Sequence, residues 1–502
     1  MQQLFEAVQW IFLLYFAGIN GGYILLNVFT FFSLPRYMQR RVLISLPRPH
    51  TDFEPPVSLV VAAYNEEEVI VSSIRSLLQI DYSQFEIIVV NDGSRDGTLK
   101  KLIEEFDLID FPEAFRQRLD HRPVRGIYRS KLYPELRVID KENGGAKADA
   151  INAGINAARY PLVCPLDADT ILQRDSIRLL VQPFLEDPTT VGAGGIVRIA
   201  NGCEVAGGFL GRVGLPRNPL ALFQVVEYMR AFLFGRVGWD ALDALPLISG
   251  AFGLFHKETV ISVGGYSKAC LGEDMELVLR MHRHFRLAGK PYRITFIADP
   301  VCWTEAPEDL RTLRNQRVRW QKGLLQCMVL YRDLVFHRKM GWLGWVALPF
   351  IFFFEGLGPI IEIAGVMSIA FGFAMGWISF ENFALIMGVA LGLGVVLSLT
   401  SLLLEEAAFH TYPRLRQVLI LIAASLFENI GYRQLNAWWR MRGLWQWWGK
   451  TDVAWGAMVR TGSWQTGSAP DRAPASLTTG GAAKAGAAAV ETATPETLRR
   501  SA

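Results

Sequence analysis

Two apolar stretches enclose a more polar middle region, and this layout constrains the fold more than any other feature of the chain. No charged residue occurs from Val8 to Phe32, and an apolar run of this length can cross a bilayer as a helix. The run lacks the basic start and the small-residue cleavage site of a signal peptide, so residues 1–35 are predicted to form a transmembrane anchor. A buried core helix is the alternative, which the length disfavours.

Basic residues follow this segment, whereas an acidic residue precedes it. Arg36, Arg40 and Arg41 lie on the C-terminal side, and Glu6 lies on the N-terminal side. Positively charged flanks stay in the cytoplasm. The N-terminus is therefore predicted to lie outside the cell (inner) membrane, and the region that follows is predicted to be cytoplasmic.

The second apolar block, residues 341–440, contains three or four candidate transmembrane helices, so the protein is predicted to be multi-pass. The candidate segments are Trp342–Phe380, Asn382–Leu404 and Val418–Trp438. The first is too long for one straight crossing of a hydrocarbon core of about 30 Å, and Gly358-Pro359 is where it would divide. This division also gives the even number of crossings that keeps the C-terminal end cytoplasmic.

Two carboxylates fall inside this block. Glu355 and Glu362 are expensive to bury in hydrocarbon, so they are candidates for a function or for pairing. The alternative places them at the interface beside Arg or Lys. Trp and basic residues alternate over 438–450, which is typical of an interfacial belt. Residues 466–502 are dominated by small and polar residues and are predicted to be a disordered tail.

Charge and cysteine content narrow the possible partners. The 51 Lys and Arg residues against 48 Asp and Glu leave a net charge of +3, so no nucleic-acid partner is expected. The five cysteines lie far apart without a C-x-x-C pair, which excludes a zinc ribbon and suits a reduced cytoplasmic domain. The sequence indicates no particular protein partner.

The middle region, residues 55–325, has the pattern of an α/β domain with a mostly parallel sheet. Val57–Ala63 and Phe85–Val90 are typical of buried strands, and Ser72–Leu78 between them has helical character. Ligands bind at the carboxyl ends of the strands in such sheets. Polar residues follow both strands there, although the cluster at 91–98 would also suit a turn with a helix cap.

A third polar cluster contains two carboxylates. Tyr160–Leu166 has the pattern of a buried strand and leads into Asp167-Ala168-Asp169. Residues i and i+2 of a strand lie on one side, so both carboxylates can face one cation. Hard oxygen ligands suit Mg²⁺ or Mn²⁺, and substrate phosphates usually complete the shell. The chain has no G-x-x-x-x-G-K-[ST] motif, which argues against a P-loop NTPase.

Six motifs occur in a characteristic order. They are Ala63-Tyr64-Asn65-Glu66, Asn91-Asp92-Gly93-Ser94, Gly144–Asn152, Asp167-Ala168-Asp169, Gly272-Glu273-Asp274 and Gln316–Trp320. This order resembles membrane-embedded family 2 glycosyltransferases, the family of bacterial poly-N-acetylglucosamine, cellulose and hyaluronan synthases. The resemblance implies a GT-A-type nucleotide-sugar-binding domain flanked by transmembrane helices. It also implies inverting transfer of a sugar from a UDP-sugar, with UDP-N-acetylglucosamine or UDP-glucose expected, to a growing polysaccharide.

The resemblance assigns donor-binding roles to residues of the first four motifs. The Tyr64–Glu66 turn, which includes Asn65, and Asp92 would hold the uracil and ribose. Lys147 would approach the diphosphate, and Asp149 would lie near the nucleotide. A divalent cation, Mg²⁺ or Mn²⁺, would bridge the diphosphate to the carboxylates of the D-x-D motif, namely Asp169 and Asp167.

The last two motifs would carry catalysis and acceptor binding. Asp274, beside Glu273, would be the general base that takes the proton from the acceptor hydroxyl. By itself, Asp274 would also suit the first turn of a helix. Arg319 would neutralise the leaving diphosphate, Trp320 would stack on the acceptor sugar, and Gln316 would lie beside it.

The segment that carries the last motif has a second interpretation. Arg319 and Trp320 would also suit an interfacial anchor, because Asn315–His337 is amphipathic. Residues 315–340 are therefore predicted to be an amphipathic helix at the membrane surface. The two interpretations are compatible, because such a helix would present Trp320 to a chain about to enter the membrane.

Three positions depart from the family pattern. Ala146 is inserted before the motif lysine, Asn91 replaces a common aspartate, and Gly272 replaces the threonine of many polymerising relatives. The glycine weakens the expectation of processive synthesis, so the alternative is a non-processive transferase that adds one sugar to a lipid-linked acceptor. The expected partners are a UDP-sugar donor, a carbohydrate or glycolipid acceptor and membrane lipid. A non-catalytic membrane scaffold would not need the acidic motifs, so their presence argues against that class. A transporter would place its polar residues within the membrane, whereas nearly all the polar motifs lie outside the apolar blocks.

Overall fold

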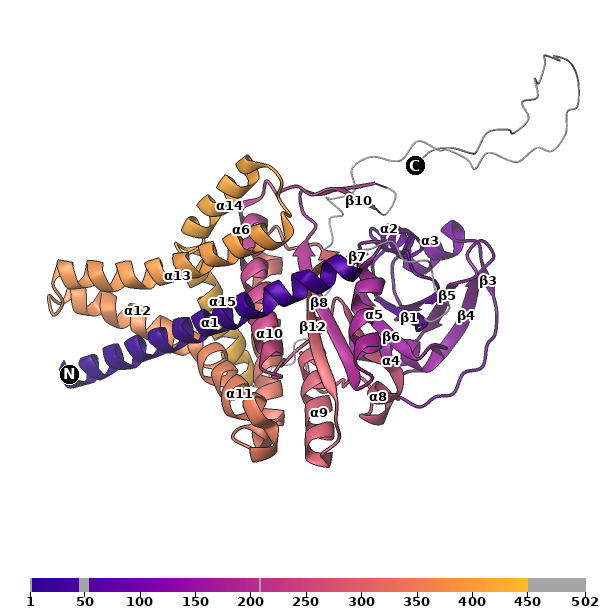
Figure 1. Cartoon of the computed structure of the whole chain (residues 1–502), viewed down its shortest axis with the longest axis horizontal. Coiled ribbons are helices and arrows are strands. Elements are labelled where there is room, and N and C mark those ends of the chain that lie inside the picture. Colours follow the sequence, from indigo (N-terminus) through magenta and orange to yellow (C-terminus); the bar gives the residue numbers. More distant parts are fainter. Residues whose placement is uncertain (1, 45–53, 207–208, 450–502) are drawn as a thin grey trace, which may run out of the picture. The chain divides into compact units, whose positions relative to one another are not determined.

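A ten-stranded mixed sheet lies at the centre of the computed structural model, which describes residues 2–44, 54–206 and 209–449 (Figure 1). The strand order is β3-β4-β5-β2-β1-β6-β11-β8-β12-β7, and β9 and β10 form a separate pair. The strands are β1 Val57–Ala63, β2 Phe85–Asn91, β3 Leu108–Asp110, β4 Val124–Ser130, β5 Leu136–Lys141, β6 Leu162–Asp167, β7 Ile171–Leu172, β8 Thr190–Ile199, β9 Glu204–Ala206, β10 Phe209–Arg212, β11 Gly253–His256 and β12 Arg293–Thr304.

The parallel part of the sheet is the run β5-β2-β1-β6. Every residue of β1 is buried, which is typical of a strand covered on both faces of a parallel sheet. β3, β4 and β11 pair antiparallel with their neighbours, and β8 pairs parallel with β12. The predicted fold class, an α/β domain with a mostly parallel core, is confirmed.

The register of these strands brings the polar motifs together. Ala63, the last residue of β1, pairs with Asn91 of β2, and Ala62 pairs with Asp167 of β6. The three strands therefore end at one edge of the sheet. The clusters that follow β1, β2 and β6 lie side by side there, as expected for the ligand edge of a parallel sheet.

Helices cover the sheet and connect its strands. α4 is buried along its whole length and packs on β1 and β2. Its Gly154 lies so close to β1 that an added Cβ would come within 2.2 Å of Val60 Cγ1. These helices are α2 Ile70–Leu77, α3 Thr98–Glu105, α4 Lys147–Ala157, α5 Ser176–Glu186, α6 Pro219–Met229, α7 Val237–Ala241, α8 Lys257–Ser262, α9 Glu273–Ala288 and α10 Leu310–Leu330.

The apolar blocks form a second group of helices, drawn beside the sheet in Figure 1. Two helices among the described residues are long and apolar enough to cross a membrane, with spans Ala7–Gln39 and Phe380–Phe409, and up to four if each of two bent helix pairs is one span. α1 packs against α12 and α13, and α15 packs against α10. The group comprises α1 Gln2–Ile44, α11 Leu348–Phe350, α12 Gly358–Ala374, α13 Phe380–Phe409, α14 Leu415–Phe427 and α15 Tyr432–Trp448.

The first bent pair breaks at the predicted position. Helical turns over Leu343–Gly356 and helix α12 meet at an angle of 45°, and α12 begins at Gly358 with a proline next to it. Proline is tolerated in the first turn of a helix and breaks a helix that precedes it. The predicted domain boundaries stay predictions, and the predicted disordered tail, 466–502, lies outside the described residues.

An ion pair joins the apolar helices to the sheet. Arg198 of β8 contacts Glu405 near the C-terminal end of α13, and both side chains are buried. The Arg198 guanidinium also lies 5.8 Å from the centre of the Trp303 ring in β12. Removing either charge would leave the other buried without its partner, which is strongly destabilising. The end of α13 is therefore fixed to the sheet.

Candidate active site

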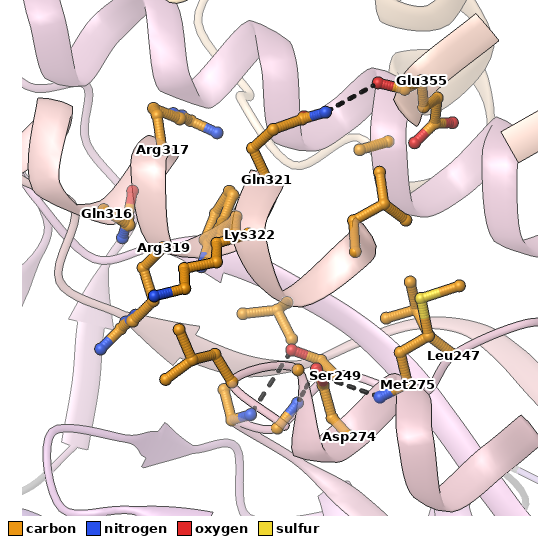
Figure 2. A pocket seen from close by; sticks show the side chains of 18 of the residues that line it. Leu247, Ser249, Asp274, Met275, Gln316, Arg317, Arg319, Gln321, Lys322 and Glu355 are labelled. Carbon is orange, nitrogen blue, oxygen red and sulfur yellow. Dashed lines mark hydrogen bonds between the residues drawn. The ribbon is translucent and has the colours of Figure 1, made fainter. Parts of the chain in front are cut away.

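A cavity of about 860 Å³ is shared by the ligand edge of the sheet and the apolar helices. Its wall includes the turn after β1, the D-x-D motif, the start of α9, the middle of α10 and residues of α1, α12, α13 and α15. Figure 2 shows part of this wall, with Asp274 on one side and the side chains of α10 on the other. Most of the residues predicted to form a site therefore line one continuous space.

The turns after β1 and β2 are fixed to each other by hydrogen bonds. The backbone N–H of Asn65 donates to Ser94 Oγ at 3.0 Å, and the Asn65 side-chain oxygen accepts from the N–H of Arg95 at 2.8 Å. Asn65 has a φ of +56°, a left-handed conformation that asparagine tolerates. The N–H of Glu66 donates to Thr98 Oγ1 at 3.0 Å. The predicted residues Tyr64, Asn65 and Glu66 all line the cavity.

The two carboxylates of the D-x-D motif both line the cavity but differ in exposure. Asp167 is the last residue of β6, and 33 % of its side chain is exposed. Asp169 is 1 % exposed and accepts a hydrogen bond from Thr304 Oγ1 at 3.0 Å. Since β6 ends at Asp167, the turn after the strand, rather than strand alternation, brings Asp169 to the cavity.

These carboxylates supply the donor atoms that a hard divalent cation prefers. Asp167 already holds a positive group, because its Oδ1 lies 2.5 Å from the ammonium of Lys147. A cation therefore fits beside Asp167. The described residues contain no group of three His, Cys, Asp or Glu side chains arranged to hold a metal.

Lys147 begins α4 and reaches across the cavity edge. Its ammonium donates to the carbonyl oxygen of Gly250 at 2.7 Å as well as pairing with Asp167. Burial alone would lower the pKa of Lys147, but the negative charges of Asp167 and Glu273 raise it above its usual value. The lysine is therefore charged. It reaches Asp167 although Ala146 is inserted before it.

The predicted base, Asp274, lies in the first turn of α9 and is held by backbone amides. Gly250 N–H donates to one carboxylate oxygen at 3.0 Å, and Met275 N–H donates to the other at 2.8 Å (Figure 2). Gly250 thus contacts both Lys147 and Asp274. Burial, and then the charge of Asp274, raise the pKa of the neighbouring Glu273 to about 7. Glu273 is therefore about half protonated at neutral pH and mostly protonated below it.

The segment before Asp274 packs tightly on α10. An added Cβ on Gly323 would lie 2.8 Å from the backbone nitrogen of Gly272, which leaves no room for a side chain. The two thiols of Cys270 and Cys327 lie 3.2 Å apart beside this contact. The N–H of Leu271 donates to the Gln326 side chain at 2.9 Å. Direct backbone packing therefore sets the spacing between the start of α9 and α10.

α10 carries the predicted acceptor residues Gln316, Arg319 and Trp320, and all three line the cavity. Trp320 is 43 % exposed. The guanidinium of Arg317 lies 4.6 Å from the centre of its ring and makes two ion-pair hydrogen bonds to Glu227 of α6, at 2.7 and 2.8 Å. Because Glu227 fixes the arginine, Arg317 supports one face of Trp320.

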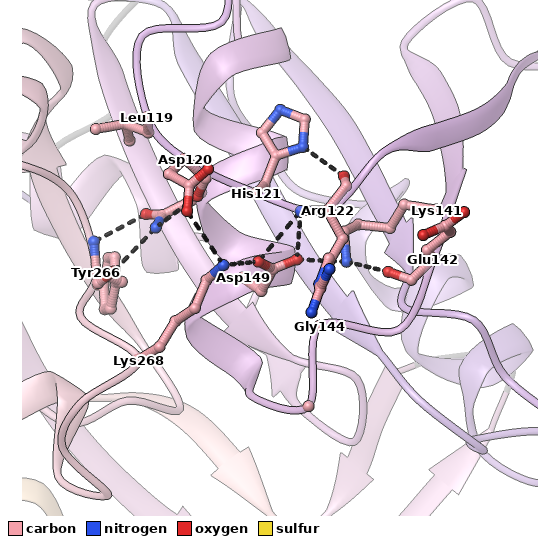
Figure 3. A network of polar contacts seen from close by, with 12 residues as sticks. Leu119, Asp120, His121, Arg122, Lys141, Glu142, Gly144, Asp149, Tyr266 and Lys268 are labelled. Atoms are coloured by element: carbon pink, nitrogen blue, oxygen red, sulfur yellow. Dashed lines mark hydrogen bonds and ion pairs between the residues drawn. The ribbon is translucent and has the colours of Figure 1, made fainter.

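Asp92 and Asp149 are not among the residues that line the cavity. Both are buried, and Lys141 at the end of β5 pairs with both. Figure 3 shows its contact with Asp149, at 2.5 Å. Lys268 is a second partner of Asp149. Burial would raise the pKa of Asp149, but its hydrogen bonds from Lys141 and Lys268 hold it below the usual value. Contacts of Asp92 and Asp149 with a nucleotide stay predictions.

Sequence reasoning missed the partners that position these residues. Lys141 and Gly250 belong to no recognised motif, and the sequence pattern gives no sign that Lys268 reaches Asp149. Lys141 ends a strand, Leu136–Lys141, that also contains Arg137 and Asp140, so its charge did not stand out in the sequence. Burial of a lysine in such a strand requires a carboxylate partner.

The apolar helices line the other end of the cavity with paired polar groups. Tyr23 of α1 donates to Glu355 at 2.9 Å, and Tyr15 of α1 donates to Glu362 at 2.7 Å. Both glutamates and Tyr23 line the cavity. Tyrosine hydroxyls pair with both glutamates, and Arg440 also donates to the backbone carbonyl oxygen of Glu355 at 2.5 Å, so both alternatives for these glutamates stay predictions. Arg230 similarly donates to Glu428 at 2.6 Å in the same wall.

Comparison with known proteins extends this description. The model of the glycosyl transferase family 2 matches residues 58–206, and that of the glycosyl transferase family group 2 matches residues 162–393. A mannosyltransferase from Pyrobaculum calidifontis, solved in complex with GDP-Man and Mn²⁺, is 18 % identical with a TM-score of 0.48, and the match covers 83 % of this chain and 99 % of that one.

Curated relatives include poly-beta-1,6-N-acetyl-D-glucosamine synthases. The protein of Staphylococcus aureus strain COL is 31 % identical over 306 residues, which are 60 % of this chain and 62 % of the relative. The Staphylococcus epidermidis protein is 28 % identical over 61 % of this chain and 62 % of its own length. The chain thus spans about 62 % of the length of these relatives. Two family models together match residues 58–393, so over this region the chain is similar to the family 2 glycosyltransferases.

Proposed function

We propose that this chain transfers a sugar from a UDP-sugar to a growing polysaccharide with inversion at the anomeric carbon, and that Asp274 is the general base. The observation that carries the proposal is the position of Asp274 in the shared cavity. Gly250 links Asp274 to Lys147, which pairs with Asp167 on the donor side, and the Gly272–Gly323 contact links its segment to α10. A base between donor and acceptor is what in-line transfer needs.

Different residues of the chain would bind the nucleotide, hold the cation and take the proton. The Tyr64–Glu66 turn binds the nucleotide, and Asp167 with Asp169 would hold the divalent cation. That cation, when bound, would neutralise charge on the leaving diphosphate. Asp274 takes the proton from the acceptor hydroxyl, which is a poor nucleophile without a base.

The acceptor side of the cavity would orient the sugar that attacks. Trp320, supported by Arg317, presents an exposed ring face on which a sugar can stack, with Gln316 beside it. Arg319 would place positive charge near the leaving group as negative charge develops there. Because its pKa is raised to about 7, Glu273 is about half protonated at neutral pH and adds less negative charge beside the base than an ordinary carboxylate would.

The relatives suggest which donor and product to test first. Their names specify a polymer of N-acetylglucosamine, so UDP-N-acetylglucosamine is the first donor and UDP-glucose the second. The second candidate function is transfer of one sugar to a lipid-linked acceptor, which Gly272 favours because many polymerising relatives have threonine there.

We also propose that α1 crosses the cell membrane once and that α12 and α13 cross it as a hairpin. The span in α1 and the apolar length of α13 support this arrangement, as does the packing of α1 against both helices. With Arg36, Arg40 and Arg41 on the inner side, the sheet and its cavity would be cytoplasmic.

The experiment uses the full chain in native membranes, incubated with a panel of radiolabelled UDP- and GDP-sugars. Incorporation from one UDP-sugar into a high-molecular-weight product that needs Mg²⁺ or Mn²⁺ is expected. A product that extracts into organic solvent as a single-sugar glycolipid would favour the second function. Absence of transfer from every UDP-sugar, with transfer from a GDP-sugar, would contradict the donor assignment.

A further inference from the structure

Lys147 lies in the middle of the acidic groups of the donor site. Its ammonium is 2.5 Å from Asp167 Oδ1 and 2.7 Å from the carbonyl oxygen of Gly250, whose own N–H binds Asp274. The side chain is only 6 % exposed. A buried ammonium needs an acidic partner, and Asp167, whose side chain is 33 % exposed, provides it.

We propose that Lys147 is a resident counter-cation: without donor, its ammonium occupies the place beside Asp167 that a divalent cation takes when it arrives with a diphosphate. This inference rests on the proposed function and adds the order in which the cation and the nucleotide bind. The divalent cation alone binds weakly, because Lys147 already neutralises Asp167. The cation binds well only as part of the nucleotide complex.

The physical reason is the cost of displacing a buried charge. A divalent cation that entered alone would force the ammonium away from Asp167, with which it pairs at 2.5 Å, and breaking a buried ion pair is unfavourable. A cation that arrives with a diphosphate brings phosphate oxygens, and these accept charge-assisted hydrogen bonds from the displaced ammonium. The exchange then leaves each charge with a partner.

The same cavity contains a matched control. Lys268 also lines the cavity, but its ammonium pairs with Asp149, which is not in the wall, and with Asp120 at 3.6 Å. Lys268 therefore contributes the same charge to the cavity without contacting Asp167. If Lys147 acts through its contact rather than through the overall charge of the cavity, only its removal will change cation binding.

The test measures Mn²⁺ binding by electron paramagnetic resonance, on the full chain in lipid nanodiscs and without donor sugar. In the unsubstituted protein, Mn²⁺ alone should bind weakly and UDP should strengthen the binding. Lys147→Met should bind Mn²⁺ alone at least about tenfold more tightly, equivalent to about 1.4 kcal/mol. Lys268→Met should bind Mn²⁺ alone as the unsubstituted protein does.

A second variant separates loss of charge from loss of fold. Lys147→Gln has no charge but keeps an amide that can donate to the Gly250 carbonyl, so it should show the same gain in Mn²⁺ affinity, and its circular dichroism should match that of the unsubstituted protein. The inference is overturned if neither Lys147 variant gains affinity, or if Lys268→Met gains as much.

The unsubstituted protein shows which proposal has failed. If it binds Mn²⁺ with UDP but the Lys147 variants gain nothing, the counter-cation inference fails and the proposed function stands. If it does not bind Mn²⁺ even with UDP, the metal assignment within the proposed function fails, and the inference fails with it.

Discussion

At the scale of single residues, Asp274 gives the sharpest prediction. Asp274→Asn keeps the size of the side chain but removes its basicity, so UDP binding should persist while transfer falls by roughly 10²–10⁴-fold. UDP affinity by calorimetry and turnover with labelled donor measure the two effects. Asp243→Asn is the control, because Asp243 pairs with Arg286 and is not among the cavity-lining residues. Near-normal turnover in Asp274→Asn would place the base elsewhere.

Glu273 makes stability depend on pH in a definite direction. Burial, and then the charge of Asp274, raise its folded pKa to about 7 from an ordinary 4.5. The folded state therefore binds the proton more tightly, so Glu273 contributes stability below pH 4.5 that is lost as the pH rises through 7.

Glu273→Gln should flatten this part of the stability profile. Melting temperatures of the ligand-free protein from about pH 5 to 8 should fall less in the variant, by a few degrees over the range. Asp240 has its pKa raised to about 7 by burial as well, so the difference between the two proteins isolates Glu273. Parallel curves for the two proteins would contradict the prediction.

The sequence predicts the position of a site residue well when the residue's own helix or strand places it, and poorly when a partner from another element does. Asp167 and Trp320 reach the cavity because the element that carries each one ends or faces there. Asp92 and Asp149 belong to motifs just as specific, yet Lys141 pairs with both of them away from the cavity wall. The pairing of Asp92 with Lys141 joins segments 49 residues apart in the sequence, which motif spacing does not report.

At the scale of elements, the contact between the start of α9 and α10 can be tested directly. A Cβ on Gly323 would meet the backbone of Gly272 at 2.8 Å and that of Leu271 at 3.1 Å. Gly323→Ala should therefore push the base segment away from the acceptor helix. Since a misplacement of about 1 Å can cost about 10²-fold in rate, transfer should fall by up to that factor while UDP binding persists.

A glycine in open space provides the control for this substitution. Nothing lies within 4 Å of the position where a Cβ would be added on Gly388 of α13, so Gly388→Ala should keep turnover near normal. If both alanine variants lost the same activity, helix glycines in general, and not this contact, would be responsible.

Element prediction succeeded where the pattern was local. β1 begins and ends at the predicted residues, and the apolar helix breaks beside Gly358 because a proline follows it. The short strand β11, Gly253–His256, was not predicted. It inserts antiparallel between β6 and β8, and that placement depends on pairing with strands that are distant in the sequence.

At the scale of the whole molecule, the cavity shared with the apolar helices predicts a route for the product. A hydrophilic chain needs a protein-lined path through hydrocarbon, and the paired groups at Glu355 and Glu362 would supply polar walls. With the full chain in sealed vesicles and donor added only outside, a long polymer protected from added glycosidase is expected. A single-sugar glycolipid that is never protected would contradict this prediction.

The two tyrosines of α1 have a consequence for how the molecule can be divided. The hydroxyls of Tyr15 and Tyr23 donate hydrogen bonds to Glu362 and Glu355. Helix α1 is therefore part of the wall of the cavity that contains Asp274. A generic hydrophobic helix fused in its place would restore attachment to the lipid but leave two carboxylates without these hydrogen bonds. When such proteins diverge or are recombined, the residues of the N-terminal helix that donate these hydrogen bonds and the carboxylates that accept them must therefore change together.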